Sequence, residues 1–594
     1  MVRRRPRRDN VPDPTRTGTD PAHLSKAAPV NDDGYYDLGS FHRKITTSSP
    51  EAQLWFDRGL LWVYGFHHEE AAVCFERAVA ADEQCAMAHW GLAYALGPNY
   101  NKPWEAFDAR DLTSTVERTH RAVQRAALDA ARATPAEQSL IDALTSRYPS
   151  AGPAPDQSVW NEEYAQAMGK VYANHGADPD VAALYADALM NLTPWQLWDL
   201  PTGRPAEGAR TVEAREALER ALARPEGRDH PGLLHLYIHL MEMSPTPEQA
   251  LPVADRLRGL VPDAGHLHHM PSHIDVLCGD YRRTIAANTR AIEADEKALA
   301  RDGAMNFYTL YRCHNLHFRL YAAMFAGQAE VAFDSVERLE AAVPEELLRV
   351  DSPPMADWLE GFLGLRVHAL VRFGRWQDLI DLPLPGDPAL YCVTTAMTHY
   401  GRGLALAATG RIREATTERA RFTAAVERVP ESRTVYNNTC LDLLAIAAAM
   451  LDGELAYRTG DFEQAFADLR RAIALDDALP YDEPWGWMQP TRHAYGALLL
   501  EQGRVAEAAD VYAADLGLND TLPRSLHHPN NVWALHGLHE CLLRLGRDAE
   551  ARIIAPQLTT ALAVADVPVR SSCYCRLETA DGADDCCSDH PSTP

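Results

Sequence analysis

A repeated two-helix pattern is the feature that most constrains how this chain folds. One motif recurs along the chain. A glycine and a polar residue come first, an aromatic or apolar residue and then an alanine follow, and apolar residues continue at helical spacing until an Asp or Pro. Residues 279–295, 460–477 and 503–516 follow this pattern, and residues 54–82 carry both helices of one unit. Each helix of such a unit is amphipathic and must stack on its neighbours to bury its apolar face. The chain is therefore expected to form an array of stacked helices.

These segments resemble the tetratricopeptide repeat, a pair of antiparallel helices of about 34 residues. The resemblance covers most of residues 50–560 and implies an all-α fold, a right-handed α-solenoid. The chain also resembles a histidine-rich bacterial tetratricopeptide subfamily in several phrases, among them HPGLLHLYIHLMEMSP at 230–245, AGHLHHMPSHI at 264–274 and CHNLHF at 313–318. This second resemblance implies a fold and no particular reaction.

The organisation along the chain follows from where the repeats begin and end. The first residues are rich in arginine but have no apolar run behind them, so they do not form a secretion signal. The four predicted segments are a disordered basic leader with an approach segment (1–48), an N-terminal repeat array with a histidine-rich groove (49–345), a C-terminal repeat array (346–567) and a flexible cysteine-rich tail (568–594).

Composition narrows the class of function. The formal net charge is −26, from 83 acidic and 57 basic residues, and such a field repels polyphosphate, so no nucleic acid partner is expected. No stretch approaches the roughly 20 apolar residues that cross a bilayer, so no membrane partner is expected either. Outside the tail, cysteines are scattered singly, which suits thiols in a reducing compartment. A cytoplasmic protein is therefore predicted.

Histidines are concentrated in three consecutive repeats. In tetratricopeptide repeats the first helix of each pair lines the concave groove through a fixed set of positions. Counting these positions from the repeat glycines, such as Gly279 and Gly327, places one set of side chains on a shared inner wall: His235, His239, Glu242, His266, His269, His273, His314 and His317, with Tyr321 beside them. Many of these histidines are three or four residues apart, so they also stack on one helix face.

This density of imidazoles requires an explanation. A single histidine on an apolar helix is most often a satisfied core residue, but many ionisable rings on one wall cost stability unless a partner compensates them. A bound metal cation is the preferred explanation, and an anion- or peptide-binding groove or a purely structural role are the alternatives. Pro271 predicts a helix that is kinked or begins near Met270–Pro271. His268 occupies a position that points away from the groove.

The ligand types favour a transition metal. Neutral imidazole binds Zn, Cu, Fe and Ni, whereas Ca and Mg prefer oxygen. These histidines and Glu242 are more than the four ligands of one closed zinc site. Two metal ions, or one ion with further histidines around its ligands, therefore fit better. Copper is the first choice, with iron or zinc as alternatives. The predicted metal ligands are His235, His239, His266, His269, His273, His314 and His317, and the predicted catalytic residues are Glu242, as ligand or base, and Tyr321, as hydrogen donor.

The predicted function is that of a metal-dependent oxidoreductase acting on a small-molecule or peptide substrate in the groove. Two alternatives remain, a non-catalytic scaffold for peptides or proteins and a metal-dependent hydrolase. His493 also falls at a groove position, where packing or capping of the solenoid explains it equally well.

The tail carries four cysteines at Cys573, Cys575, Cys586 and Cys587. Thiols on a flexible acidic segment bind Cu(I) or Zn, or exchange disulfides. An unstructured end with incidental cysteines is the alternative. A tail that loads metal into the groove would connect the two features.

Overall fold

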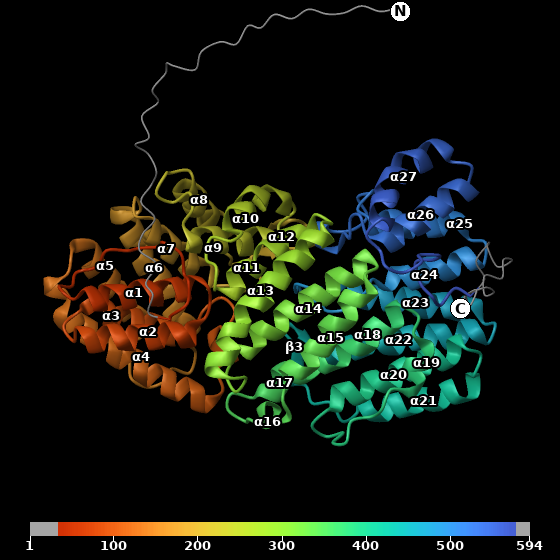
Figure 1. Ribbon diagram of the computed structural model, residues 1–594, viewed down its shortest axis with the longest axis horizontal. Helices are drawn as coiled ribbons and strands as arrows, with labels where there is room; N and C mark the ends of the chain where they lie inside the picture. Colours follow the sequence, from red (N-terminus) through yellow and green to blue (C-terminus); the bar gives the residue numbers. More distant parts are fainter. Residues whose placement is uncertain (1–33, 578–594) are drawn as a thin grey trace, which may run out of the picture.

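The fold is an α-solenoid of tetratricopeptide-like helix pairs, seen in a computed structural model that describes residues 34–577 (Figure 1). The first half consists of α1 Pro50–Tyr64, α2 His68–Ala81, α3 Ala86–Leu96, α4 Ala109–Asp129, α5 Pro135–Arg147, α6 Ser158–His175, α7 Pro179–Met190, α8 Thr211–Leu222, α9 Pro231–Glu242, α10 Leu251–Leu257, α11 Gly265–His269, α12 Pro271–Leu277, α13 Tyr281–Asp302, α14 Thr309–Ala326 and α15 Ala329–Ala342.

The second half contains short helices and then regular pairs again. It consists of α16 Glu345–Leu348, α17 Met355–Leu359, α18 Leu365–Arg372, α19 Trp376–Asp381, α20 Cys392–Ala408, α21 Ile412–Val426, α22 Cys440–Arg458, α23 Phe462–Asp477, α24 Thr491–Glu501, α25 Val505–Asp515, α26 Val532–Arg544 and α27 Asp548–Leu562. Two short antiparallel hairpins interrupt the array, β1 Trp198–Asp199 with β2 Arg204–Pro205, and β3 Thr434–Val435 with β4 Asn438–Thr439.

The first repeat shows why the sequence forms tight helix pairs. α1 begins after Ser49, whose side chain accepts the backbone N–H of Ala52, as an N-cap residue does. The ring of Phe75 in α2 lies against Gly59 and Gly91, and a Cβ at either glycine would collide with it. Small residues therefore let α1, α2 and α3 approach closely around one buried aromatic ring.

The approach segment before α1 packs onto the array. Arg43 is buried and its guanidinium lies 2.9 Å from Asp178 and 2.6 Å from Asp180, at the start of α7. Ile45 is also buried. The part of the predicted leader that the structure describes, 34–48, is thus fastened to the N-terminal repeats, and residues 1–33 lie outside the described chain.

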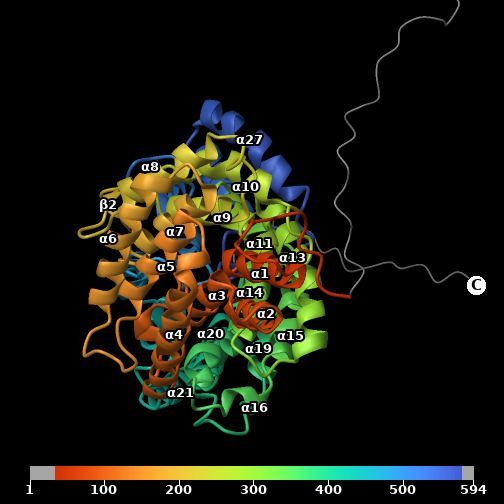
Figure 2. The ribbon, with the colours of Figure 1, turned by 90° about the vertical axis from the view of Figure 1, so that its left-hand side faces the viewer.

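The C-terminal repeats return to the middle of the array. Tyr281 in α13 donates a hydrogen bond to the carbonyl oxygen of Pro529 at 2.9 Å. Trp533 in α26 donates from its indole to the carbonyl oxygen of Met324 at 2.7 Å. Figure 2 shows α9, α11 and α14 near the middle of the view, with α4–α8 on one side and α13 and α15 on the other. The inner wall is therefore enclosed rather than open.

The beginning of the predicted flexible tail is packed. Ser572 is buried and donates to the carbonyl oxygen of His493 at 2.8 Å, while Arg372 donates to the carbonyl oxygen of Ser572 at 3.1 Å. Cys573 and Cys575 form a disulfide. The prediction of flexibility does not hold for residues 568–577, because buried hydrogen bonds anchor this segment to α18 and α24. Cys586 and Cys587 lie outside the described residues.

None of the helices in the described range 34–577 is long and apolar enough to span a bilayer.

Candidate metal centre

Three successive inner helices bring the predicted histidines together. α9 carries His235 and His239, the interrupted segment α11–α12 carries four histidines, three of them on the inner wall, and α14 carries His314. The break between α11 and α12 falls at Met270, directly before Pro271, as the sequence predicts. We call six of these residues the histidine centre, whose ligand atoms form a first set of His235, His239 and His266 and a second set of His269, His273 and His314.

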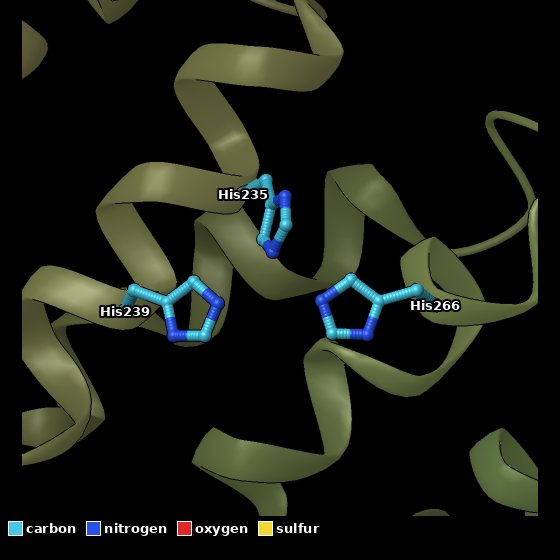
Figure 3. A group of neighbouring side chains, drawn as sticks. All are labelled: His235, His239 and His266. Atoms are coloured by element: carbon cyan, nitrogen blue, oxygen red, sulfur yellow. The ribbon is translucent and has the colours of Figure 1, made fainter. Parts of the chain in front are cut away.

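The first set presents nitrogen atoms that have no hydrogen-bond partner. His235 donates from Nδ1 to the carbonyl oxygen of Tyr64 at 2.6 Å, and His239 donates from Nδ1 to Glu242 Oε1 at 3.0 Å. Each ring then has a lone pair on Nε2, and neither Nε2 has a partner among the described residues, nor has either nitrogen of His266. One nitrogen from each ring lies within 4.8 Å of the other two, and Figure 3 shows the rings around one space.

The second set is oriented by an amide. The Asn288 side chain donates from its nitrogen to Ser272 Oγ at 3.0 Å and to the carbonyl oxygen of Thr284 at 2.9 Å. Its oxygen therefore faces His269, whose Nδ1 lies 2.7 Å away and must donate. This arrangement leaves the lone pair of His269 on Nε2.

Two of these lone pairs converge. His273 Nδ1 lies 2.7 Å from Glu242 Oε2 and 2.6 Å from Glu483 Oε2, so this nitrogen carries a hydrogen when both carboxyl groups are ionised. The Nε2 atoms of His269 and His273 then face each other at 2.7 Å. Two lone pairs at this separation repel, so a positive charge, either a proton or a metal cation, is needed between or beside them.

Glu242 joins the two sets. Its two oxygens accept from His239 and from His273, and with Glu483 it forms a third group of potential ligands around His273. Burial raises the pKa of Glu242 to about 8 and that of Glu483 well above its usual range. Carboxyl groups with pKa values raised in this way hold a proton near neutral pH, and a metal cation bound beside them would take the place of that proton.

Burial also keeps the rings in the form that binds metals. It lowers the pKa of five of them well below the usual value, and neighbouring imidazoles lower it further: His235, His239, His266, His269 and His314. A neutral imidazole is the ligand form of histidine.

A cavity of about 280 Å³ opens onto the centre. Its wall includes His239, His266, His273 and His314 together with aromatic residues such as Trp195, and no lysine or arginine of the described chain lines it. The β3–β4 hairpin closes one side, because the ring of Tyr436 lies 4.8 Å from that of His314. Trp195 and Tyr436 both have left-handed backbone, with φ of 61° and 49°, and strain of this kind is frequent at functional sites.

Three of the other residues considered in the sequence analysis lie elsewhere. His317 turns its Nε2 towards Met488 Sδ at 2.8 Å and belongs to neither set. Tyr321 packs its ring on Phe325 at 4.5 Å and does not line the cavity. His268 points away, with Nε2 2.9 Å from the carbonyl oxygen of Pro262.

Two residues of the site have no signal in the sequence. Glu483 lies in the phrase YDEPWGWM at 481–488, and nothing in its local pattern shows that it reaches His273. Asn288 lies on α13, the second helix of its repeat, and no histidine spacing points to it. Its four-residue separation from Thr284 predicts only a local hydrogen bond.

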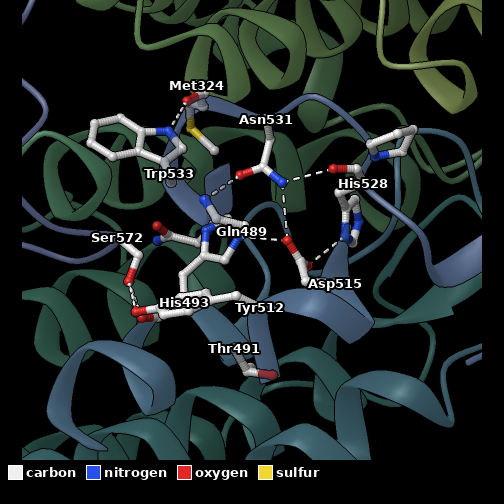
Figure 4. A network of polar contacts seen from close by, with 12 residues as sticks. Met324, Gln489, Thr491, His493, Tyr512, Asp515, His528, Asn531, Trp533 and Ser572 are labelled. Carbon is white, nitrogen blue, oxygen red and sulfur yellow. Dashed lines mark hydrogen bonds and ion pairs between the residues drawn. The ribbon is translucent and has the colours of Figure 1, made fainter. Parts of the chain in front are cut away.

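A second buried cluster of histidines lies between α24, α25 and α26 (Figure 4). His493 donates from Nε2 to Asp515 at 2.9 Å and accepts from Arg372 at Nδ1, and His528 donates from Nδ1 to Asp515 at 2.9 Å. Asn531 donates to the same carboxylate at 3.0 Å. We call these residues the Asp515 network: Arg372, His493, Asp515, His528 and Asn531.

Comparisons with known proteins show likeness of fold only. No protein-family model and no curated protein matches the sequence. The chain is similar to a solved Rap protein complexed with competence and sporulation factor, with a TM-score of 0.28 and 10% identity over 68% of this chain and 98% of that chain. It is similar to the human IFIT1 dimer with m7Gppp-AAAA, with a TM-score of 0.31 and 10% identity over 89% of this chain and 92% of that chain. It is also similar to yeast Tom70, with a TM-score of 0.30 and 12% identity over 86% of this chain and 99% of that chain. Likeness at these TM-scores says nothing about what this chain binds.

Proposed function

We propose that this chain is a metal-binding protein whose histidine centre holds one or two transition-metal ions. The observation that carries the proposal is the group of buried imidazole nitrogens on His235, His239 and His266 that have no partner within residues 34–577. An unpaired buried polar atom costs free energy that a metal–ligand bond would offset. The carbonyl and carboxylate partners on the opposite nitrogens are those that orient metal-ligating imidazoles.

The donor set favours copper. Each set offers three imidazoles and no thiolate, and the two sets are neighbours, with ring centroids of His266 and His269 5.5 Å apart. Copper, iron and zinc all accept imidazole. Copper stays the first choice because two neighbouring three-histidine sets suit a pair of such ions, with iron or zinc as the alternatives that metal analysis separates.

Beyond metal binding, we propose that the protein is an oxidoreductase that acts on a small molecule. The cavity of about 280 Å³ is large enough for a small substrate and opens directly onto the centre. Copper or iron bound there would supply electron transfer. Glu242 holds the rings of His239 and His273, so its role is to orient ligands and couple the two sets. Glu483 lines the cavity and its Oε1 has no hydrogen-bond partner among the described residues, so this carboxyl group, with its raised pKa, is placed to exchange a proton with a substrate.

Metal analysis of the purified full-length protein tests the proposal. Protein produced with Cu, Fe or Zn should contain about one or two ions per chain, and its absorption spectrum should identify the metal. A double His235→Ala, His273→Ala variant should lose most of this metal, while the control His268→Ala should keep it. Substoichiometric metal in the wild type that does not fall further in the double variant contradicts the proposal.

A scaffold that binds peptides is the second candidate, because the structure contains a wider cleft. This cleft of about 940 Å³ lies beside the β1–β2 hairpin and shares Trp195 and Asn437 with the wall of the inner cavity. Prolines and aromatic residues line much of it, as suits an extended peptide. Capture of a defined peptide by metal-free protein, with no turnover by the metal-loaded form, would favour the scaffold.

A further inference from the structure

His317 and Met488 form a pair of potential ligands outside the histidine centre. His317 Nε2 lies 2.8 Å from Met488 Sδ, and both side chains are buried. His317 Nδ1 has no partner among the described residues. If Nε2 carries the hydrogen, the lone pair on Nδ1 is left unpaired, and if Nδ1 carries it, lone pairs of nitrogen and sulfur face each other. A neutral ring therefore cannot satisfy both nitrogens in this position.

The pair lies beside the centre, and the chain segment that carries Met488 borders a cavity at the docked cysteines. On one side, the ring of His317 lies 6.4 Å from that of His314, which belongs to the second set. On the other side, the neighbours of Met488 in the chain, Trp487 and Gln489, line a small cavity together with Cys573 and Cys575. Cys573 is half-buried and Cys575 is buried. The segment 487–489 thus contacts the centre through the Met488–His317 pair and borders the cavity at the cysteine pair.

We propose that His317 and Met488 form a transfer site for Cu(I) between the Cys573–Cys575 pair and the histidine centre. The inference rests on the proposed function, because it needs a centre that receives copper. Thiolate and thioether sulfur select Cu(I), and one imidazole with one thioether is too small a donor set for a closed zinc shell. A site with few donors releases its ion readily to a neighbour with more.

The cysteine pair must be reduced before it binds copper. Two molecules of a thiol reductant convert the disulfide into two cysteine thiols and become one disulfide themselves. Binding of Cu(I) by the two sulfurs then releases the two thiol protons. The oxidation state of copper does not change in these steps, so transfer to His317 and Met488 is a ligand exchange.

The rate of copper uptake tests the proposal. Metal-free full-length protein, reduced with a phosphine that converts the disulfide to thiols, is mixed with Cu(I) held by a coloured chelator, and the loss of colour is followed. Met488→Leu conserves volume and removes the sulfur. It should take up the same final amount of copper about ten-fold or more slowly. A double Cys573→Ser, Cys575→Ser variant should show the same delay.

The controls separate this inference from the function on which it rests. Met397→Leu, at a buried methionine of α20, should load at the wild-type rate. Uptake by Met488→Leu at the wild-type rate overturns the transfer site. A lower final copper content in Met488→Leu overturns it as well, because the pair would then belong to the permanent centre. If the wild type itself takes up no copper, the proposed function fails first.

Discussion

The histidine centre and the Asp515 network are both buried clusters of histidines, yet they differ in their hydrogen bonds. In the network, His493 donates to Asp515 from one nitrogen and accepts from Arg372 at the other. In the centre, Nε2 of His235 and Nε2 of His239 have no partner among the described residues. Burial alone therefore does not distinguish a binding site from a structural cluster. The distinction comes from hydrogen-bonding capacity that the protein leaves unused.

The largest expected effect concerns stability of the network. Asp515→Ala removes the only carboxylate that both His493 and His528 contact in the described structure. The buried N–H donors of His493, His528 and Asn531 would lose their acceptor, at a cost of about 1–3 kcal/mol each, so the denaturation midpoint should fall sharply while metal content per folded chain stays unchanged. Asp520→Ala, at an exposed position, serves as the control. A small loss of stability, similar to that of the control, would remove the contrast between the clusters.

The pH dependence of the free energy of unfolding should show that the fold keeps His493 neutral. Burial lowers the pKa of His493 to about 4, compared with 6.5 for a free ring. Between these two values the unfolded chain binds a proton that the folded chain does not, so the free energy of unfolding falls as the pH drops from 6.5 to 4. One such proton contributes a slope of about 1.4 kcal/mol per pH unit.

His493→Gln should reduce this slope by about one proton in denaturant titrations of metal-free protein across that range. An unchanged slope would show that His493 is not held neutral by the fold, and would contradict the hydrogen-bond assignment in the network.

Replacing a ring of the histidine centre should increase the stability of the metal-free protein rather than decrease it. His266→Phe removes two buried nitrogens that have no partner among the described residues and keeps an aromatic side chain, so metal-free protein should become more stable by about 1 kcal/mol. The same change should lower metal content. Thermal unfolding with and without added metal measures both effects. A clear destabilisation of the metal-free form would mean that His266 is as well satisfied as His493.

The smallest effect is expected at a histidine that belongs to neither cluster. His268 is half-buried and faces the carbonyl oxygen of Pro262. His268→Ala should change stability by less than about 0.5 kcal/mol and leave metal content as in the wild type. Loss of metal in this variant would show that the inner wall extends further than the two sets.

Much of the fold was predictable from the sequence because it depends on local patterns. The apolar period of the helices, the glycines where they cross and the helix break before Pro271 all appear in neighbouring residues. The same periodicity predicts that His235 and His239 share one face of α9. For the tail, sequence composition was misleading, since residues 568–577 look polar and flexible but dock through buried hydrogen bonds of Ser572.

The site was predictable only in part, because repeat positions define a wall but not its contacts. They place His317 beside His314, whereas the return of the chain after α23 brings Met488 to His317 and so separates it from the second set. They place Tyr321 on the same wall, yet packing against Phe325 keeps it out of the cavity.

By itself, the sequence determined an all-α repeat array and a dense row of imidazoles on its inner helices, since helical periodicity sets which residues share a face. Only the tertiary structure decided which nitrogens are satisfied. Tyr64, Asn288 and Glu483 reach the rings from other helices and loops, and they determine which nitrogen of each ring keeps its lone pair. The physical reason is that a hydrogen bond depends on distance in space, and superhelical winding brings together residues that are far apart in the chain.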